Sequence, residues 1–455
     1  MSKKHNKKRP VTRSERIKAK ATSLNENGHG MIKYQGKSVP VPFLLAGEEA
    51  LLDLEKVGKH YQSTIQSVIK RSPDRVSPTC PYYYSCGGCQ LQHLDYKKQG
   101  KLKENQVKGL LPKKKVDPII LMKEPYYYRN KVIASVATQN KKLITGFYKP
   151  FSHEVVAIDH CEVQMPQADK ILKTLRSLCS KHKIQAYNED TQNGFLRHIL
   201  LKMGHKTDEV LVTFVVASKV FPSKAKLLKD LKEAHPEIKS ITMNINNRKT
   251  SVVLGKEEII LHGDGKIKDN LCGYDFKISS QSFYQINPVQ TEKLYQTAMD
   301  LAQIKKDEVV LDTYSGIGTI SIIATKHAKM VYGVELNKEA VKDANHNAKL
   351  NKINNIKFVQ ADATHAMVQM AKERFHIDVL FLDPPREGST PEFINAALKL
   401  KPKKIVYISC NPYTLARDLK LFEKAYKVER VVPVDMFPHT SHVECISRLV
   451  RKEKK

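Results

Sequence analysis

The chain has 455 residues, and its 77 Lys and Arg against 47 Asp and Glu give a formal net charge of +30 at pH 7. This length exceeds one ordinary hydrophobic core and predicts two or three domains. The charge indicates a polyanionic partner such as RNA or DNA, because neutralised phosphates supply most non-specific nucleic-acid affinity. No stretch approaches the roughly 18 apolar residues of a membrane span. No apolar segment follows the N-terminal charges either, so we expect a cytoplasmic protein without a membrane partner.

The first part of the chain changes from a basic segment to one with short alternating apolar runs. Residues 1–20 carry nine Lys and Arg and one Glu without a hydrophobic period, which indicates a disordered basic arm. Residues 21–72 contain short alternating apolar runs separated by turn glycines, a pattern typical of a small β-barrel. A second domain is predicted to begin after Ser72-Pro73.

Three cysteines open this second domain. Cys80, Cys86 and Cys89 lie within ten residues of each other, around the tight turn that Gly87-Gly88 predicts, and Cys161 follows at a distance. Disulfides are a poor expectation in a reducing compartment. Four soft ligands in one domain suit zinc or an iron–sulfur cluster, and the spacing does not decide between them. The alternative is accidental clustering.

A polar helix is expected from about Tyr96 to Leu111, and a strand-rich stretch from about 124 to 280 follows it. Strands are predicted at His198–Lys202 and Val210–Val216, and a helix at Pro222–Glu233. This mixture is typical of an α+β domain.

From Gln285 onward, helices alternate with nearly continuous apolar strands, which predicts a parallel sheet covered on both faces. The stretch Val443–Val450 alternates instead and predicts an additional edge strand. The expected parallel strands are Val309–Asp312, Met330–Glu335, Ile356–Gln360, Val379–Asp383 and Ile405–Ile408.

The turn Asp312–Thr319 follows one strand and opens a helix, and its glycines permit a close approach to a ligand. Glu335 ends the next strand, where a carboxylate can accept both ribose hydroxyls of a nucleoside. NAD would use the same arrangement. However, Ile320 or Ser321 replaces the third glycine of the dinucleotide fingerprint, which favours S-adenosylmethionine. Asp362 is expected near the adenine, although a solvated turn carboxylate explains it equally well.

Two further strand ends indicate covalent pyrimidine chemistry. Asp383-Pro-Pro-Arg386 lacks the aromatic fourth residue that amino-methyltransferases stack on a flipped base, which argues for methylation of carbon. Cys410 follows the last parallel strand, and a thiolate that adds to C6 of uracil makes C5 nucleophilic enough to attack a methyl donor. The alternative for Cys410 is a buried structural thiol.

The C5 proton must leave before the thiol is eliminated, so a carboxylate is needed near the site. Glu444, within His442-Val-Glu444, is the candidate base. The competing interpretation is an ordinary salt-bridged residue on a strand.

Taken together, these motifs make the chain resemble the bacterial RNA uracil-5-methyltransferases, specifically the 23S ribosomal RNA branch that carries a cluster. The resemblance covers about residues 15–451. It rests on the four cysteines and on Phe283-Tyr-Gln285-Ile-Asn287, the turn from Asp312 to Gly318, Asp383-Pro-Pro-Arg386, Ser409-Cys410-Asn-Pro and His442-Val-Glu444.

The resemblance implies a multidomain protein. A basic tail at 1–14 would precede an OB-like TRAM β-barrel at 15–72 that binds RNA. A central α+β iron–sulfur domain at 73–280 and a Rossmann-like α/β methyltransferase domain at 281–455 would follow, and the helix near 93–123 is expected to pack on the catalytic domain.

The resemblance also implies roles for residues. Cys410 would be the nucleophile and Glu444 the base. S-adenosylmethionine contacts are expected from Gln285, Tyr314, Glu335 and Asp383, whereas some relatives have Asn where this chain has Thr319. The [4Fe-4S] ligands would be Cys80, Cys86, Cys89 and Cys161. We expect a monomer that methylates C5 of uridine in 23S rRNA.

Two alternatives stay open. A transfer-RNA uracil-5-methyltransferase shares the catalytic motifs but usually lacks both the barrel and the four cysteines, so their presence favours ribosomal RNA. A non-catalytic ribosome assembly factor with a degenerate methyltransferase fold predicts broken motifs, whereas the nucleophile, base and donor-site residues are all present here.

Overall fold

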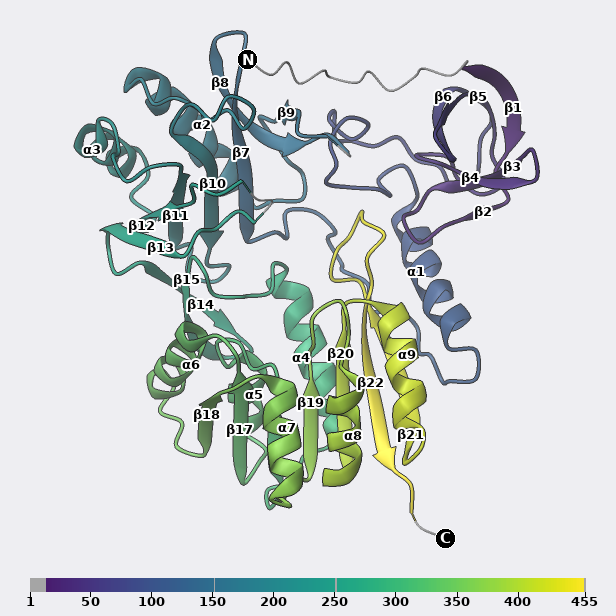
Figure 1. Ribbon diagram of the computed structural model, residues 1–455, viewed down its shortest axis with the longest axis vertical. Coiled ribbons are helices and arrows are strands. Elements are labelled where there is room, and N and C mark those ends of the chain that lie inside the picture. The colour runs from purple at the N-terminus through teal and green to yellow at the C-terminus, as the bar shows by residue number, and fades with distance from the viewer. Residues whose placement is uncertain (1–13, 151, 250–251, 454–455) are drawn as a thin grey trace, which may run out of the picture. The chain divides into compact units, whose positions relative to one another are not determined.

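The computed structural model describes residues 14–150, 152–249 and 252–453 (Figure 1). The predicted basic tail therefore lies outside the described residues except for its last residue. The chain divides into two compact units. Unit 1 comprises residues 1–106 and 437–441, and unit 2 comprises 107–436 and 442–455. Within the described ranges, no helix has both the length and the apolar character that crossing a membrane requires.

Unit 1 contains two small antiparallel sheets with the orders β1-β5-β6 and β2-β3-β4. Ile32, Val39 and Leu52 are buried in the core between these strands. The disordered arm predicted over residues 15–20 is wrong there, because these residues form β1 and Ile17 packs on this core. The strands are β1 (Glu15–Lys20), β2 (Ser23–Leu24), β3 (Gly30–Tyr34), β4 (Lys37–Val41), β5 (Glu49–Val57) and β6 (His60–Lys70).

Unit 1 also holds a loop from the far end of the sequence, residues 437–441. The carbonyl of His439 accepts hydrogen bonds from the backbone N–H groups of Gln90 and Leu91, both at 2.9 Å. The side-chain oxygen of Gln99 accepts from the His439 N–H at 3.0 Å. Gln99 belongs to α1 (Tyr96–Leu110), the polar helix that the sequence predicted. This loop is therefore fixed to unit 1 by several hydrogen bonds.

Unit 2 begins with a seven-stranded mixed sheet of order β13-β12-β11-β10-β7-β8-β9. Helices α2 (Pro166–Lys181) and α3 (Lys224–Ala234) contact each other and bury Leu175 and Leu227 against the sheet. The strands are β7 (Lys131–Gln139), β8 (Lys142–Tyr148), β9 (Val155–Ala157), β10 (Leu196–Met203), β11 (Val210–Val216), β12 (Ile238–Ile245) and β13 (Glu257–His262). A hairpin of β14 (Lys266–Leu271) and β15 (Tyr274–Ser279) follows.

The second sheet of unit 2 has the order β18-β17-β16-β19-β20-β22-β21. Its first five strands are parallel, as predicted, because each crossover passes through a helix. The strands are β16 (Val309–Asp312), β17 (Met330–Glu335), β18 (Ile356–Gln360), β19 (Val379–Leu382), β20 (Lys404–Ser409), β21 (Tyr426–Val434) and β22 (Glu444–Arg451). The helices are α4 (Pro288–Ala302), α5 (Thr319–Thr325), α6 (Lys338–Leu350), α7 (Ala363–Lys372), α8 (Pro391–Leu400) and α9 (Pro412–Phe422).

One strand position differs from the prediction. β22 is not an edge strand, because it pairs antiparallel with β20 on one side and with β21 on the other. Burial explains the error, since the first four residues of β22 are all buried and only its end alternates. The strand Tyr426–Val434 is the last one in the sheet order, and Val116 and Ile120 form isolated bridges to its outer side.

Three helices of this domain begin at a proline behind a capping side chain. Asn287 precedes Pro288 in α4, and Asn411 precedes Pro412 in α9. Proline suits the first helical turn because its missing N–H has no partner there, and the asparagine side chain accepts a hydrogen bond from a free N–H of that turn. α9 therefore begins immediately after Cys410.

Candidate active site

The carboxyl ends of the parallel strands place most of the predicted site residues at one edge of the sheet. Asp312 ends β16, Glu335 ends β17, Asp383 follows β19 and Cys410 follows β20. Ligands of open α/β sheets bind at this edge. The motif residues thus gather although up to 98 positions separate them in the sequence.

Glu444 reaches the same edge because β22 runs antiparallel to β20. Ser409 at the end of β20 is paired with Cys445 near the start of β22. Cys410 follows Ser409, and Glu444 precedes Cys445, the residue that faces Ser409 across the two strands. The candidate nucleophile and the candidate base are adjacent, and the charge of Glu444 acts on the Cys410 thiol.

Cys410 is partly exposed, and burial is the main reason why its pKa rises to about 11. The charges of Glu444 and Asp383 raise this pKa further, whereas the guanidinium of Arg386 lowers it. The thiol is therefore protonated at neutral pH in the free protein. Any use as a nucleophile requires proton removal together with substrate binding.

Three carboxyl groups near Cys410 have raised pKa values. Burial raises the pKa of Glu444 to about 8 and that of Asp383 to about 7, and the neighbouring carboxylates of Asp383 and Asp312, respectively, add to these shifts. Burial likewise raises the pKa of Asp312 to about 6, although the Ser321 hydroxyl donates to its Oδ2 at 2.5 Å. Several buried carboxylates so close together favour a cationic ligand.

Sequence reasoning missed Tyr295, which lies in the interior of α4 and is 2 % exposed. Its hydroxyl is 3.3 Å from Thr319 Oγ1, and burial raises its pKa well above the usual value. The charges of Asp383 and Glu444 contribute to this shift, so the phenol adjoins the buried carboxylates. A tyrosine at helical spacing on an apolar face gave no signal in the sequence.

The turn after β16 holds Glu335 in a fixed orientation. The Gly316 N–H donates to Glu335 Oε2 at 3.0 Å, and the Asn337 N–H donates to Oε1 at 2.7 Å. Gly316 has a φ of +53°, and a Cβ at this position would meet no atom within 4 Å. The turn therefore borders open space beside an oriented carboxylate, which fits a nucleoside.

Tyr314 and Gln285 are the other two predicted donor-site residues. The Tyr314 ring lies 5.9 Å from the Phe393 ring, and burial raises the pKa of Tyr314 to about 12. Gln285 is buried in the loop before α4, and its carbonyl accepts from Asn130 Nδ2 at 3.2 Å. Gln285 is therefore buried, whereas Tyr314 is half-buried.

The loop that carries Gln285 is attached to its neighbours by Lys202, a buried lysine of β10. Its Nζ donates to the carbonyls of Ser279 and Ser282 at 2.7 and 2.6 Å. The Ser282 hydroxyl in turn donates to Asp343 of α6 at 2.9 Å. β10 and α6 thus fix the same loop.

Lys202→Met is expected to lower the free energy of unfolding by about 2 kcal/mol, because two buried carbonyls lose their hydrogen-bond donor. Urea unfolding of the full chain measures this. Lys131→Met is the matched control, since Lys131 is the neighbour of Lys202 across β7 and β10. Equal losses in the two variants would contradict a specific role for Lys202.

Arg386 and His442 form a second contact that the sequence did not reveal. Arg386 Nη2 lies 3.0 Å from His442 Nδ1, and the Arg386 carbonyl accepts from Asn411 Nδ2 at 3.1 Å. Arg386 thus contacts both Asn411, which follows Cys410, and His442, which lies two residues before Glu444. Arg386 was predicted only as a departure from an aromatic motif.

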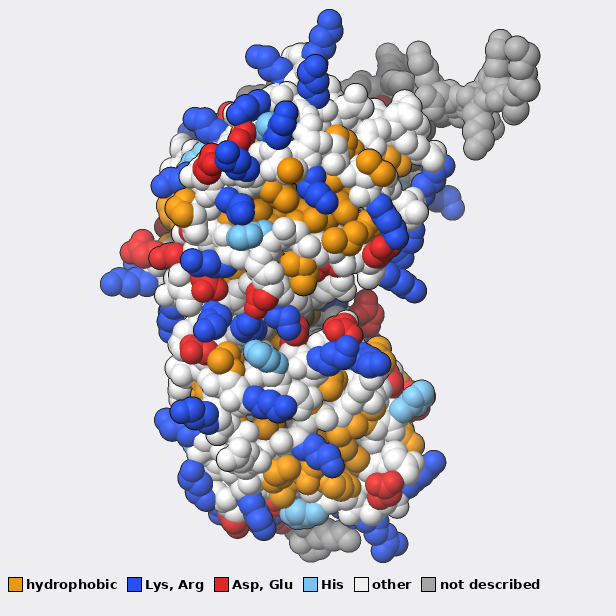
Figure 2. Space-filling view, turned by 90° about the vertical axis from the view of Figure 1, so that its left-hand side faces the viewer, with side chains coloured by type: hydrophobic (Ala, Val, Ile, Leu, Met, Phe, Trp, Pro, Cys, Tyr) orange, Lys and Arg blue, Asp and Glu red, His pale blue; other side chains and the backbone are white. Residues whose placement is uncertain are grey.

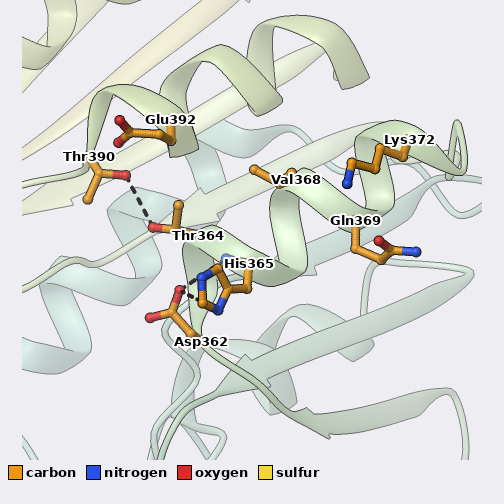
Figure 3. A pocket seen from close by; sticks show the side chains of 8 residues that line it. All are labelled: Asp362, Thr364, His365, Val368, Gln369, Lys372, Thr390 and Glu392. Carbon is orange, nitrogen blue, oxygen red and sulfur yellow. Dashed lines mark hydrogen bonds and ion pairs between the residues drawn. The ribbon is translucent and has the colours of Figure 1, made fainter.

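A hollow of about 690 Å³ lies along α7 and at the beginning of α8 (Figure 3). Asp362 lies at this hollow and caps α7 by accepting from the His365 N–H at 3.0 Å. Thr364 and Thr390 approach each other across it, with 3.2 Å between their hydroxyl oxygens. The charge of Asp362 also raises the pKa of Tyr314, so the hollow adjoins the predicted donor site.

The predicted cluster cysteines belong to different units, with Cys80, Cys86 and Cys89 in unit 1 and Cys161 in unit 2. The Gly88 N–H donates to Cys86 Sγ at 3.4 Å, and burial raises the pKa of Cys161 to about 11 while the N–H groups of the following residues lower it. Within the described part of the chain, no three His, Cys, Asp or Glu residues gather closely enough to hold a metal ion. The thiols have the soft donor chemistry that a cluster requires.

The sheet, the donor turn and the strand-end residues define a methyltransferase with a Rossmann-like fold. A solved structure of the same fold, the tRNA (uracil-54, C5)-methyltransferase of Pyrococcus abyssi in complex with S-adenosyl-L-homocysteine, superimposes with a TM-score of 0.78 at 28% identity. The match covers 95% of this chain and 99% of that one.

The family follows from the sequence comparison. The chain belongs to the tRNA (uracil-5-)-methyltransferase family, whose model matches residues 95–452. An RNA methyltransferase of Oceanobacillus iheyensis is 41% identical over 454 residues, which cover 98% of each chain. One of Caldanaerobacter subterraneus subsp. tengcongensis is 40% identical over 444 residues, covering 96% of this chain and 98% of the relative. The suspected resemblance to RNA uracil-5-methyltransferases is thereby confirmed, and the protein is an RNA methyltransferase.

Proposed function

We propose that this protein transfers a methyl group from S-adenosylmethionine to C5 of uridine in 23S rRNA, as a cytoplasmic monomer. The observation that carries the proposal is the juxtaposition of Cys410 and Glu444 on two adjacent antiparallel strands. Both lie at the edge of the sheet where the donor turn ends. A thiol and a carboxyl group in this relation are what C5 methylation of a pyrimidine requires.

In the first step the Cys410 thiol loses its proton to solvent, and Sγ forms a bond to C6 of the uracil ring. The electron pair of the C5–C6 bond moves toward O4, so C5 becomes nucleophilic. Arg386, whose charge favours the Cys410 thiolate, supports this addition. S-adenosylmethionine supplies the methyl group as a sulfonium electrophile.

Glu444 completes the reaction. Its carboxylate takes the proton from C5, the C5–C6 double bond forms again, and the bond from C6 to Sγ breaks. Because burial raises the pKa of Glu444 to about 8, its carboxyl group must first lose a proton to solvent, and the resulting carboxylate is a stronger base than an exposed one. Glu444 is then protonated again and the released Cys410 thiolate takes up a proton from solvent, which restores the starting state.

The methyl donor is held, in this proposal, by Gln285, Tyr314, Glu335 and Asp383. The Glu335 carboxylate, oriented by the N–H groups of Gly316 and Asn337, accepts the ribose hydroxyls. The charge of Asp383 interacts both with Asp312, where the donor turn begins, and with Glu444. Its negative charge suits a sulfonium centre.

Binding of S-adenosylmethionine is expected to release protons between about pH 6 and 8. The pKa of Asp383 is about 7 and that of Asp312 about 6 in the free protein, and a nearby cation stabilises the ionised form and lowers both values. Affinity for the donor should therefore rise with pH through this window. Titration calorimetry in buffers of different ionisation enthalpy counts the protons.

S-adenosylhomocysteine is the matched control, since its neutral thioether lacks the positive charge. Asp383→Asn should remove most of the proton release while the fold persists. Equal proton release with both ligands would show that the carboxylates do not face the sulfonium.

Cys80, Cys86, Cys89 and Cys161 are proposed to bind a [4Fe-4S] cluster. Their soft thiolates support this, as does the N–H donation to sulfur seen at Cys86. No step of methyl transfer depends on the cluster. Protein purified without oxygen should contain iron and sulfide and absorb broadly in the visible range, and Cys89→Ser should lose this absorbance. Stoichiometric zinc without iron would overturn the assignment.

A second substrate is favoured by a specific observation. The structure of the Pyrococcus abyssi enzyme, which acts on uracil-54 of tRNA, covers 95% of this chain. The N-terminal sheets therefore do not by themselves exclude a tRNA substrate. Transfer RNA remains the alternative to 23S rRNA.

Tritium release from uridine labelled at C5 separates the two substrates. Purified full-length protein and S-adenosylmethionine are mixed with unmodified 23S rRNA or with unmodified transfer RNA. Release from the ribosomal transcript alone is the expected result. Release only from transfer RNA would keep the chemistry and change the substrate, and release from neither would favour the assembly factor.

A further inference from the structure

A hollow of about 700 Å³ lies at the opposite edge of the methyltransferase sheet, where β20 begins and β22 ends. Figure 1 shows the arrow of β22 ending in this region. Leu398, Tyr426 and Val450 form its apolar part. β20 has six residues, so at about 3.3 Å per residue the hollow lies about 20 Å from Cys410.

Five cationic side chains and one acidic side chain line this hollow. The acidic residue is Glu453, and the cations are Lys401, Lys403, Lys424, Arg451 and Lys452. The face drawn in Figure 2 differs, because acidic side chains there are interspersed among the basic ones. The hollow itself carries an excess of four positive charges, from five basic residues and one acidic residue.

The ordinary explanation for basic residues here is that they compensate the C-terminal ends of α8 and α9. It accounts for two of them, since Arg451 donates to the Lys401 carbonyl and Lys452 to the Glu423 carbonyl, both at 2.7 Å. Lys403 is paired with Asp378 at 2.9 Å. The helix-end carbonyls are thereby satisfied from within the protein.

Lys401 and Lys424 remain without such a role. Both are exposed, and among the described residues neither side chain has an ion-pair partner or a hydrogen bond. The nearby Glu423 is already paired with Lys114. The ammonium groups of Lys401 and Lys424 are thus uncompensated, which favours an anionic ligand. The phosphate backbone of RNA is the anionic ligand expected for an RNA methyltransferase.

We propose that this hollow binds the phosphodiester backbone of the substrate RNA at a distance from the target uridine. The proposal rests on the proposed function only in taking RNA as the substrate. Such contacts position the RNA without reading its sequence. They would increase affinity for long substrates and leave the chemical step unchanged.

The test uses the full-length chain and the double variant Lys401→Gln/Lys424→Gln. Fluorescence anisotropy measures Kd for a fragment of the substrate RNA over a range of KCl concentrations. The expected result is a roughly tenfold weaker Kd and a salt slope reduced by about 1.4 to 1.8, as two lost phosphate contacts predict. In tritium release, KM for RNA should rise and kcat should stay unchanged.

Lys224→Gln/Lys226→Gln on α3 is the matched control, because it removes the same charge from another exposed surface of unit 2. An unchanged Kd and salt slope in the hollow variant, or equal changes in both double variants, would overturn the proposal. Either of these binding results would leave the proposed methylation of uridine intact. Failure of the wild-type protein to methylate any RNA would instead contradict the proposed methylation without testing the hollow. Lys424→Glu serves as a second variant and should weaken binding more than Lys424→Gln.

Discussion

Replacing Cys410 by Ala is expected to lower turnover by at least about a thousandfold, because no other group can add to C6 of the uracil ring. Binding of S-adenosylmethionine should persist, since Gln285 and Glu335 do not depend on the thiol. Tritium release measures the first quantity and titration calorimetry the second. The separation of binding from turnover is the signature of a lost nucleophile.

Cys272→Ala is a suitable control for this experiment. Cys272 is also partly exposed and also has a pKa raised to about 11 by burial, but it lies at the turn of the β14–β15 hairpin, away from the strand ends. Its loss should leave turnover within a factor of two or so of the wild type. Normal turnover in Cys410→Ala would sink the covalent mechanism.

Glu444→Gln is expected to accumulate a covalent adduct of protein and RNA. Addition of Cys410 and methyl transfer still occur, but the C5 proton has no acceptor, so the bond from C6 to Sγ cannot break. Gel electrophoresis under denaturing conditions should show a stable slower band that contains labelled RNA. The fraction trapped should approach the amount of protein present.

Two companion variants make the result specific. Cys410→Ala/Glu444→Gln should form no adduct, because the bond that traps the RNA begins at Cys410. Glu429→Gln, on the neighbouring strand β21, should turn over without trapping, since Glu429 is paired with Arg448 away from the catalytic edge. Rapid turnover by Glu444→Gln would assign the proton to another acceptor.

Much of the catalytic sheet could be predicted from the sequence because its signals are local. Apolar runs such as Val379–Leu382 are fully buried strands, and the polar residues that follow them must lie at one edge. The positions of Asp312, Asp383 and Cys410 follow from this rule alone. Glu444 could be predicted as a site residue only from the motif that contains it, since its position at this edge depends on the direction of its strand.

The remaining parts depend on contacts between distant segments. Tyr295 lies beside the buried carboxylates because α4 packs on the sheet, and nothing in the spacing of α4 distinguishes it from an ordinary core residue. The interior position of β22 required knowledge of its partner β21. Arg386 and His442 meet across 56 residues, and a sequence pattern cannot register such a pair.

The loop of residues 437–441 connects β21 to β22, yet it belongs to unit 1. Hydrogen bonds from Gln90 and Leu91 hold His439, and Glu444 is only five residues further along the chain. A short covalent tether therefore joins Glu444, the proposed base, to a segment that is anchored in unit 1.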